Sequence, residues 1–222
     1  MMQLYTENNS KQGTVWKKAM VLLAGLTFLS CSPDKIMAET KAYSYNQNSK
    51  GVAIFAGGCF WCMEQPLESV PGIKAVYSGY CGGKERSPAY KQVASGMTSH
   101  VESVLVEFDE TKITYEQLLQ HFWQNINPVQ RNGQFYDIGP HYRTVIFYIN
   151  QEQKEIAQKS KAALQKSGKF NKPIATEILP ATEFWLAEDY HQDYYKKEPE
   201  AYYRYKNGSG RAQYLKETWG KN

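Results

Sequence analysis

Cys59 is the residue whose surroundings best suit chemistry. It follows the pair Gly57-Gly58 and stands three residues before Cys62, with two large aromatic residues between the cysteines. The apolar run over residues 52–56 predicts a buried strand that ends at the glycines, and the residues after them can begin a helix. Free backbone N–H groups at a helix N-terminus favour a thiolate over a thiol. The segment therefore predicts a reactive cysteine and sulfur chemistry.

The cysteine count supports a reactive thiol. Cys31 lies in the N-terminal leader, which leaves three cysteines, Cys59, Cys62 and Cys81, for the domain. An odd number is hard to reconcile with a purely structural disulfide framework in an exported protein. A zinc site that combines these cysteines with His100 is the alternative. Their spacing is not typical of paired zinc ligands, and a metal would silence the nucleophile, so we expect no metal.

The first forty residues are typical of an export signal. Two lysines at residues 17–18 precede an apolar run over residues 19–29, which is too short for an ordinary membrane span. Leu29-Ser30-Cys31 resembles a bacterial lipobox, in which Cys31 would carry a lipid anchor, and residues 36–38 offer a soluble cleavage site instead. We predict a protein of the cell envelope, either periplasmic or lipid-anchored. A cytosolic protein with an uncleaved N-terminus is the alternative.

The elements that must position the cysteines lie further along the chain. We divide it into a leader (1–40), a polar tether (41–50) and a single domain (51–222), long enough for one core. The formal net charge of +4 falls when the leader lysines are removed, so nucleic-acid binding is not indicated. We also expect the protein to be a monomer. Strand-like runs occur at residues 52–56, 73–80, 101–108, 144–149 and 174–179.

Helices are predicted between these strands. Thr114 is placed to cap a helix over residues 115–125, and Asn150 a later one that ends at Ser167-Gly168. Apolar and polar residues alternate over residues 101–108, as in a strand with one solvent-exposed face. This strand is expected to pair antiparallel with the run over residues 73–80. Alternating strands and helices indicate an α/β or α+β sandwich of two layers. The aromatic and basic sequence after Ala187 predicts an irregular tail on the surface.

Four further segments carry polar residues on expected loops or strand starts. They are Gly79-Tyr80-Cys81-Gly82-Gly83, Pro88-Ala89-Tyr90, Ser99-His100-Val101-Glu102 and Tyr136-Asp137-Ile138-Gly139-Pro140-His141-Tyr142-Arg143. Together with residues 57–64, and in this order, they resemble the peptide methionine sulfoxide reductase A family from about residue 52 to residue 192. The resemblance implies a two-layer α/β plait with a ferredoxin-like core and a long irregular C-terminal segment.

The resemblance also implies roles for individual residues. Cys59 takes the place of the family's nucleophile, and Glu102 that of its catalytic glutamate, although Ser99 replaces the usual glycine nearby. The family's remaining pocket positions, two tyrosines, two aromatic residues that surround the substrate methyl group and one aspartate, correspond to Tyr90, Tyr142, Phe60, Trp61 and Asp137. From the pattern alone, Glu102 would be an outward charge on a half-exposed strand.

The implied reaction explains this set of residue types. A sulfoxide sulfur becomes electrophilic when its oxygen is protonated or strongly hydrogen-bonded, and a carboxylic acid in a partly apolar pocket can hold that proton. Tyrosine hydroxyls can donate to the same oxygen. A thiolate then attacks the sulfur and is left as a sulfenic acid. The expected activity is reduction of methionine S-sulfoxide, protein-bound or free, for repair of oxidised proteins.

The thiol that reduces the sulfenic acid stays open between two cysteines. Cys62 has the spacing of CxxC redox pairs, and Cys81 could reach Cys59 from a flexible glycine-rich loop. No cysteine follows Cys81, so the C-terminal resolving cysteines of many family members are absent. No cofactor is expected, and the electrons would come from an external, thioredoxin-like reductant.

Two other functions compete with the reductase. Cys59 and Cys62 would also suit a thioredoxin-like disulfide oxidoreductase, although the sequence lacks a thioredoxin-type strand order. A zinc-stabilised or peptide-binding envelope module would use the aromatic tail as its contact surface. Turnover of a methionine sulfoxide and the metal content of the purified protein separate the three.

Overall fold

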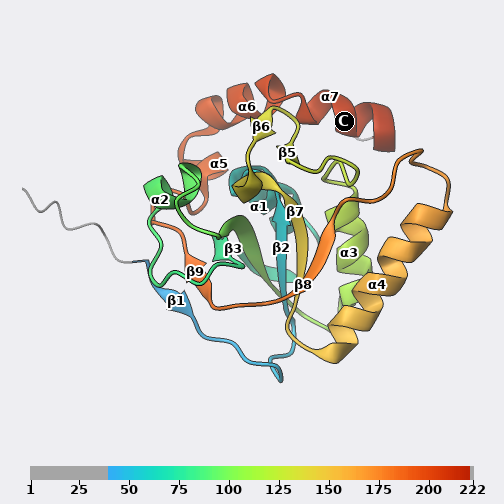
Figure 1. The fold of residues 1–222 in the computed structure, drawn as a ribbon, viewed down its shortest axis with the longest axis horizontal. Helices are drawn as coiled ribbons and strands as arrows, with labels where there is room; N and C mark the ends of the chain where they lie inside the picture. The colour runs from blue at the N-terminus through green and yellow to red at the C-terminus, as the bar shows by residue number, and fades with distance from the viewer. Residues whose placement is uncertain (1–39, 221–222) are drawn as a thin grey trace, which may run out of the picture. The chain divides into compact units, whose positions relative to one another are not determined.

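The computed structural model describes residues 40–220. The predicted leader, including Cys31, lies outside them. A mixed α/β fold is built on a seven-stranded sheet with the order β1-β9-β3-β4-β2-β7-β8 (Figure 1). Its strands are β1 (Ala42–Tyr43), β2 (Val52–Gly57), β3 (Ile73–Cys81), β4 (Val101–Phe108), β7 (Thr144–Tyr148), β8 (Glu177–Pro180) and β9 (Phe184–Leu186). Neighbouring strands are antiparallel except β7 and β8, which are parallel.

The sequence predicted most of these strands well. The run over residues 101–108 is β4, and its antiparallel pairing with β3 is confirmed. β8 begins at Glu177, three residues later than expected. The expectation of a wet face on β4 is wrong, because Glu102 and Ser103 are both buried. β4 is a central strand, and the alternation of its side chains reflects two covered faces rather than one.

Each face of the sheet carries its own core cluster. On one face, Phe55 packs with residues of α1 (Phe60–Glu68) and α3 (Tyr115–Trp123). On the other face, Ile54 belongs to a cluster with Phe184, and Tyr43 and Tyr45 pack against that cluster. Side chains alternate along a strand, so neighbouring residues of β3 enter different clusters. Tyr80 belongs to the first cluster and Cys81 to the second.

The predicted helix caps are confirmed. The Thr114 hydroxyl accepts a hydrogen bond from the backbone N–H of Gln117 (3.2 Å), and the Gln117 side chain accepts one from Thr114 (2.9 Å). Asn150 accepts from the N–H of Gln153 at the start of α4 (Gln151–Lys166). Shorter elements connect the rest: α2 (Tyr90–Ala94), the hairpin β5 (Gly133–Gln134) and β6 (Asp137–Ile138), and the 3-10 turn η1 (Pro140–Tyr142).

The C-terminal segment differs from the prediction. Three helices replace the irregular tail: α5 (Tyr194–Lys197), α6 (Pro199–Gly208) and α7 (Arg211–Trp219). Proline suits the first turn of α6, and Gly210, with φ 80°, makes the left-handed turn into α7. Buried Tyr202 and Arg211 anchor the helices, which lie beside β5 and β6 (Figure 1). Within residues 40–220, no helix is both long enough and apolar enough to cross a membrane.

Candidate active site

Cys59 is the N-cap of α1, where the chain leaves β2. The turn needs glycine, because Gly58 has φ 87° and a Cβ there would lie 2.6 Å from the Gln134 side chain. Cys59 is only 5% exposed. Burial raises the pKa of its thiol well above the ordinary value, opposed by a hydrogen bond with Tyr205. The helix N-terminus was predicted to favour a thiolate, but in the resting protein desolvation outweighs that effect.

Glu102 lies on β4 beside the start of α1. Its Oε2 accepts a hydrogen bond of 3.2 Å from the backbone N–H of Phe60, the residue after Cys59. The side chain is 1% exposed, and burial raises the pKa of its carboxyl to about 8 while the Phe60 bond lowers it. At neutral pH the carboxyl therefore holds a proton. It is the buried acid that sulfoxide chemistry requires.

Tyr90, Tyr142 and Asp137 reach the same place from three separate elements. Tyr90 begins α2, Tyr142 ends η1 and Asp137 lies on β6. Burial raises the pKa of Tyr90 to about 12, with further increases from Glu102 and Cys59, and the same causes raise the pKa of Tyr142. Both hydroxyls therefore stay protonated and can donate. Burial also raises the pKa of Asp137.

Aromatic rings surround these groups. The rings of Phe60 and His191 lie 4.9 Å apart, and Trp61 stacks on Tyr194 at 3.9 Å between centroids. The Trp61 indole N–H donates to His191 Nδ1 (3.2 Å), and burial lowers the pKa of His191 to about 4. His191 is therefore a neutral acceptor that orients Trp61.

Sequence reasoning missed several residues of this site. The Glu188 carboxylate accepts hydrogen bonds of 2.8 Å from the Tyr90 backbone N–H and from the Tyr80 hydroxyl. Tyr205, on α6, interacts with Cys59 and Asp137 and lowers the pKa of both side chains. Because the segment after Ala187 was predicted to be an irregular surface tail, Tyr205 was not expected in the pocket. The spacing of polar and aromatic residues over 199–208 was the available signal for a helix there.

The structure separates the two candidate resolving cysteines. Cys62 lies one helical turn from Cys59, and the interaction between the two thiols raises the pKa of Cys59 and lowers that of Cys62. Cys81 was expected in a flexible loop, and that expectation is wrong: it is the last residue of β3, paired with Val101 and buried on the other face of the sheet. Its sulfur lies 3.7 Å from the Thr182 carbonyl, and burial raises its pKa to about 11. Glycines in this segment serve close packing, since a Cβ on Gly79 would lie 2.3 Å from the Trp185 carbonyl.

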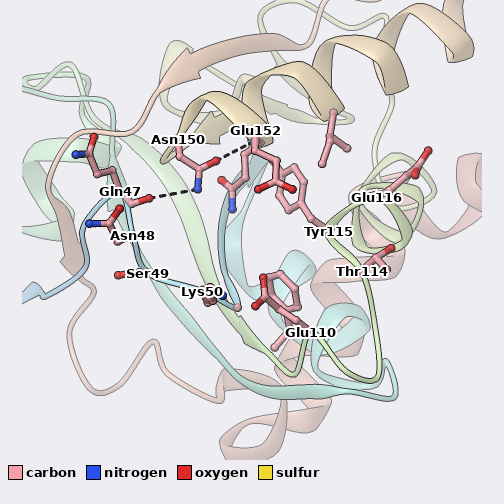
Figure 2. A pocket seen from close by; sticks show the side chains of 14 residues that line it. Gln47, Asn48, Ser49, Lys50, Glu110, Thr114, Tyr115, Glu116, Asn150 and Glu152 are labelled. Carbon is pink, nitrogen blue, oxygen red and sulfur yellow. Dashed lines mark hydrogen bonds between the residues drawn. The ribbon is translucent and has the colours of Figure 1, made fainter.

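A separate cavity lies at the opposite end of β2. It has a volume of about 600 Å³ and lies between the N-termini of α3 and α4 (Figure 2). Polar side chains line much of it, among them Lys50, Glu110 and Asn150, whose amide donates to the Gln47 carbonyl (3.4 Å). None of the predicted site residues lines this cavity. The sulfur chemistry therefore belongs to the cluster around Cys59.

A buried cysteine beside a protonated carboxyl and two tyrosine hydroxyls defines a thiol-dependent oxidoreductase. The family described as peptide methionine sulfoxide reductase matches residues 51–222. Peptide methionine sulfoxide reductase MsrA of Listeria monocytogenes serotype 4a is 53% identical over 167 residues, covering 75% of this chain and 94% of its own. The corresponding protein of Bacillus licheniformis is 51% identical over 170 residues, covering 77% and 94%.

Solved structures agree. Mxr1 from Saccharomyces cerevisiae in reduced form superposes with a TM-score of 0.64 at 30% identity, covering 67% of this chain and 86% of its own. Methionine sulfoxide reductase A of Corynebacterium diphtheriae has a TM-score of 0.59 at 30% identity, with coverage of 69% and 78%. The chain belongs to the peptide methionine sulfoxide reductase family. It is a peptide-methionine (S)-S-oxide reductase.

Proposed function

We propose that Cys59 reduces methionine S-sulfoxide, free or in oxidised proteins, and that Glu102, Tyr90 and Tyr142 activate the substrate oxygen. The observation that carries this assignment is the buried Glu102 carboxyl, hydrogen-bonded to the residue that follows Cys59. A pKa of about 8 keeps it protonated at neutral pH. It is thus a positioned general acid next to a thiol.

The first step consumes one thiol and one sulfoxide. Glu102 and the two tyrosine hydroxyls hydrogen-bond the sulfoxide oxygen, which makes its sulfur electrophilic. The Cys59 sulfur loses its proton and attacks, the oxygen passes to Cys59, and the methionine thioether leaves. Two electrons move from Cys59 to the substrate sulfur, and Cys59 becomes a sulfenic acid. The thiol proton replaces the one that Glu102 supplied, so no net charge develops.

The aromatic wall supplies the binding energy for the substrate. Phe60 is buried and Trp61 is half-buried and held by His191 and Tyr194. We infer that these two rings enclose the methyl group, and that Asp137, held by Tyr205, accepts a hydrogen bond from the polar part of the substrate. The pocket then fixes the sulfoxide with one epimer's oxygen directed at Glu102.

Cys62 is the resolving cysteine in this account. It lies one helical turn from Cys59, whereas the sheet separates Cys81 from Cys59. Attack of Cys62 on the sulfenic acid forms a disulfide and releases water. An external dithiol of the thioredoxin type, rather than a cofactor, would then reduce the disulfide and complete the cycle.

The remaining assignments concern the setting of the reaction. We infer that the central strands β3-β4-β2-β7, with α1 and α3 as crossovers, are a ferredoxin-like plait. We further propose that the protein acts as a monomer in the cell envelope, exported by residues 1–40 and either released or lipid-anchored through Cys31. The apolar run and lipobox-like residues of the leader support this location.

One assay tests the function. The purified protein is given each methionine sulfoxide epimer separately, free and within a peptide, with dithiothreitol or reduced thioredoxin. We expect methionine from the S epimer only. Equal reduction of the two epimers, or reduction of a disulfide substrate without sulfoxide turnover, would contradict the proposal.

A further inference from the structure

Arg211 is a buried cation without a carboxylate partner. Its side chain is 1% exposed, and none of the ion pairs found in the described part of the chain includes it. Its guanidinium donates to the carbonyls of Gly57 (2.7 Å) and Asn125 (2.6 Å), lies 4.5 Å from the Phe135 ring centroid, and leaves Nε without an acceptor. Burying an unpaired charge is costly. An anion nearby would offset that cost.

The guanidinium lies against the start of α1. Gly57, one of its acceptors, ends the strand before the cysteine turn, and Nη1 lies 3.7 Å from the sulfur of Met63, the neighbour of Cys62. A second cation approaches one turn further along α1. Lys206, on α6, donates to Gln65 Oε1 at 3.1 Å, and Gln65 is three residues after Cys62. The C-terminal helices therefore bring two cations to the part of α1 that carries the second cysteine.

Two carboxyl groups and two tyrosine hydroxyls also face Cys62. Burial raises the pKa of Glu102 to about 8, which keeps that carboxyl protonated at neutral pH. Burial also raises the pKa of Asp137, while Tyr205 and Arg211 lower it. The hydroxyls of Tyr202 and Tyr205 also have raised pKa values, through burial first. For Cys62, the interaction with Cys59 lowers the pKa most, and Arg211 and Lys206 lower it further, against its burial and the negative charge of Asp137.

We propose that Arg211, with Lys206, holds Cys62 as the thiolate that attacks the Cys59 sulfenic acid. Arg211 is thus a positioning residue, and this inference rests on the proposed function. The Cys62 sulfur bonds to the Cys59 sulfur, the S–O bond of the sulfenic acid breaks, and the departing hydroxide takes a solvent proton to become water. Cys62 is oxidised and the Cys59 sulfur is reduced, so atoms and electrons balance.

The Cys62 thiolate can be measured without catalysis. In protein that carries Cys31→Ser, Cys59→Ser and Cys81→Ser, Cys62 is the one cysteine left. Absorbance at 240 nm, followed below the pH at which tyrosines ionise, then reports ionisation of Cys62. Lys206→Gln and Arg211→Gln should raise the midpoint, Arg211→Gln by about one unit or more, a tenfold change in the ionisation constant. Lys216→Gln removes the same charge from an exposed position of α7 and should leave the midpoint unchanged.

Kinetics supply the second readout, in protein with both redox cysteines. After one equivalent of substrate, Lys206→Gln and Arg211→Gln should slow formation of the Cys59–Cys62 disulfide several-fold and leave the release of the first methionine unaffected. If Arg211→Gln fails to fold, two other variants test the inference. Lys206→Gln must raise the midpoint of Cys62 ionisation, and the charge-conserving Arg211→Lys must leave it unchanged. An unchanged midpoint in Lys206→Gln and in any folded Arg211→Gln overturns the inference. Failure of the unmodified protein to release methionine would instead refute the proposed function.

Discussion

The backbone N–H of Phe60 donates a hydrogen bond of 3.2 Å to Oε2 of the Glu102 carboxyl group, and this bond joins the start of α1 to the middle of the sheet. The same helix start holds Cys59. The hydrogen bond favours the ionised carboxyl, but complete burial disfavours it more strongly, and the pKa settles at about 8. The acid and the nucleophile are therefore fixed relative to each other by a backbone contact.

Glu102→Gln should slow formation of the sulfenic acid by roughly a hundred-fold, the usual cost of losing a positioned general acid. The pH dependence gives a sharper result. In the unmodified protein the protonated carboxyl is the active form, so this step should slow as pH rises through about 8. In Glu102→Gln that decline should disappear. Single-turnover release of methionine from pH 6 to 9 measures it, and an identical decline in the variant would assign the titration to another group.

The same carboxyl should make the protein less stable at higher pH. Its pKa is raised from 4.5 to about 8 on folding, so its contribution is fully present below pH 4.5 and is lost as pH rises through 8. Glu102→Gln lacks this titration, so between pH 5 and pH 8 the unmodified protein should lose about 3.5 kcal/mol more of its unfolding free energy than the variant does. Urea unfolding at pH 5 and pH 8 checks this. Equal pH slopes for the two proteins would contradict it.

The tyrosine hydroxyls should contribute to the same step. Tyr90→Phe and Tyr142→Phe each remove one donor to the sulfoxide oxygen and should lower the single-turnover rate about tenfold. Tyr203→Phe is the matched control, because Tyr203 is 50% exposed on α6. Rates for Tyr90→Phe and Tyr142→Phe equal to that of the control would return both residues to a packing role.

Much of the fold followed from local patterns in the sequence. The strand that leads to Cys59 and the caps at Thr114 and Asn150 depend on short-range periodicity and capping, and these predictions are confirmed. Burial of Glu102 was predicted only through the family resemblance. A single strand cannot report whether the face that carries Glu102 is covered, because that depends on residues elsewhere in the chain, such as Phe60 and Trp185.

The C-terminal half of the site shows the same limit. Tyr205 and Arg211 reach the cysteines through tertiary packing of α6 and α7, which the local composition of an aromatic, basic segment did not reveal. The place of Cys81 also depended on tertiary structure. Neighbouring glycines suggested a mobile loop, but they serve close contacts within a paired strand.

Cys62→Ser and Cys81→Ser should differ clearly. Cys62→Ser should release one methionine per enzyme and then stop with thioredoxin as reductant, because no thiol lies near the sulfenic acid. Cys81→Ser should turn over normally, since Cys81 faces the opposite cluster. Peptide mapping of the unmodified protein after one equivalent of substrate should show a Cys59–Cys62 crosslink. A Cys59–Cys81 crosslink would reverse the assignment, and normal turnover of both variants would mean that an external thiol reduces Cys59 directly.

The most direct test of the account is the amount of methionine released when the enzyme meets excess methionine S-sulfoxide without any reductant. The unmodified protein should release one methionine per molecule and lose two free thiols, Cys59 and Cys62. Cys59→Ser should release none while its circular dichroism spectrum and unfolding midpoint stay close to those of the unmodified protein. Release of one equivalent by folded Cys59→Ser would contradict the claim that Cys59 is the nucleophile.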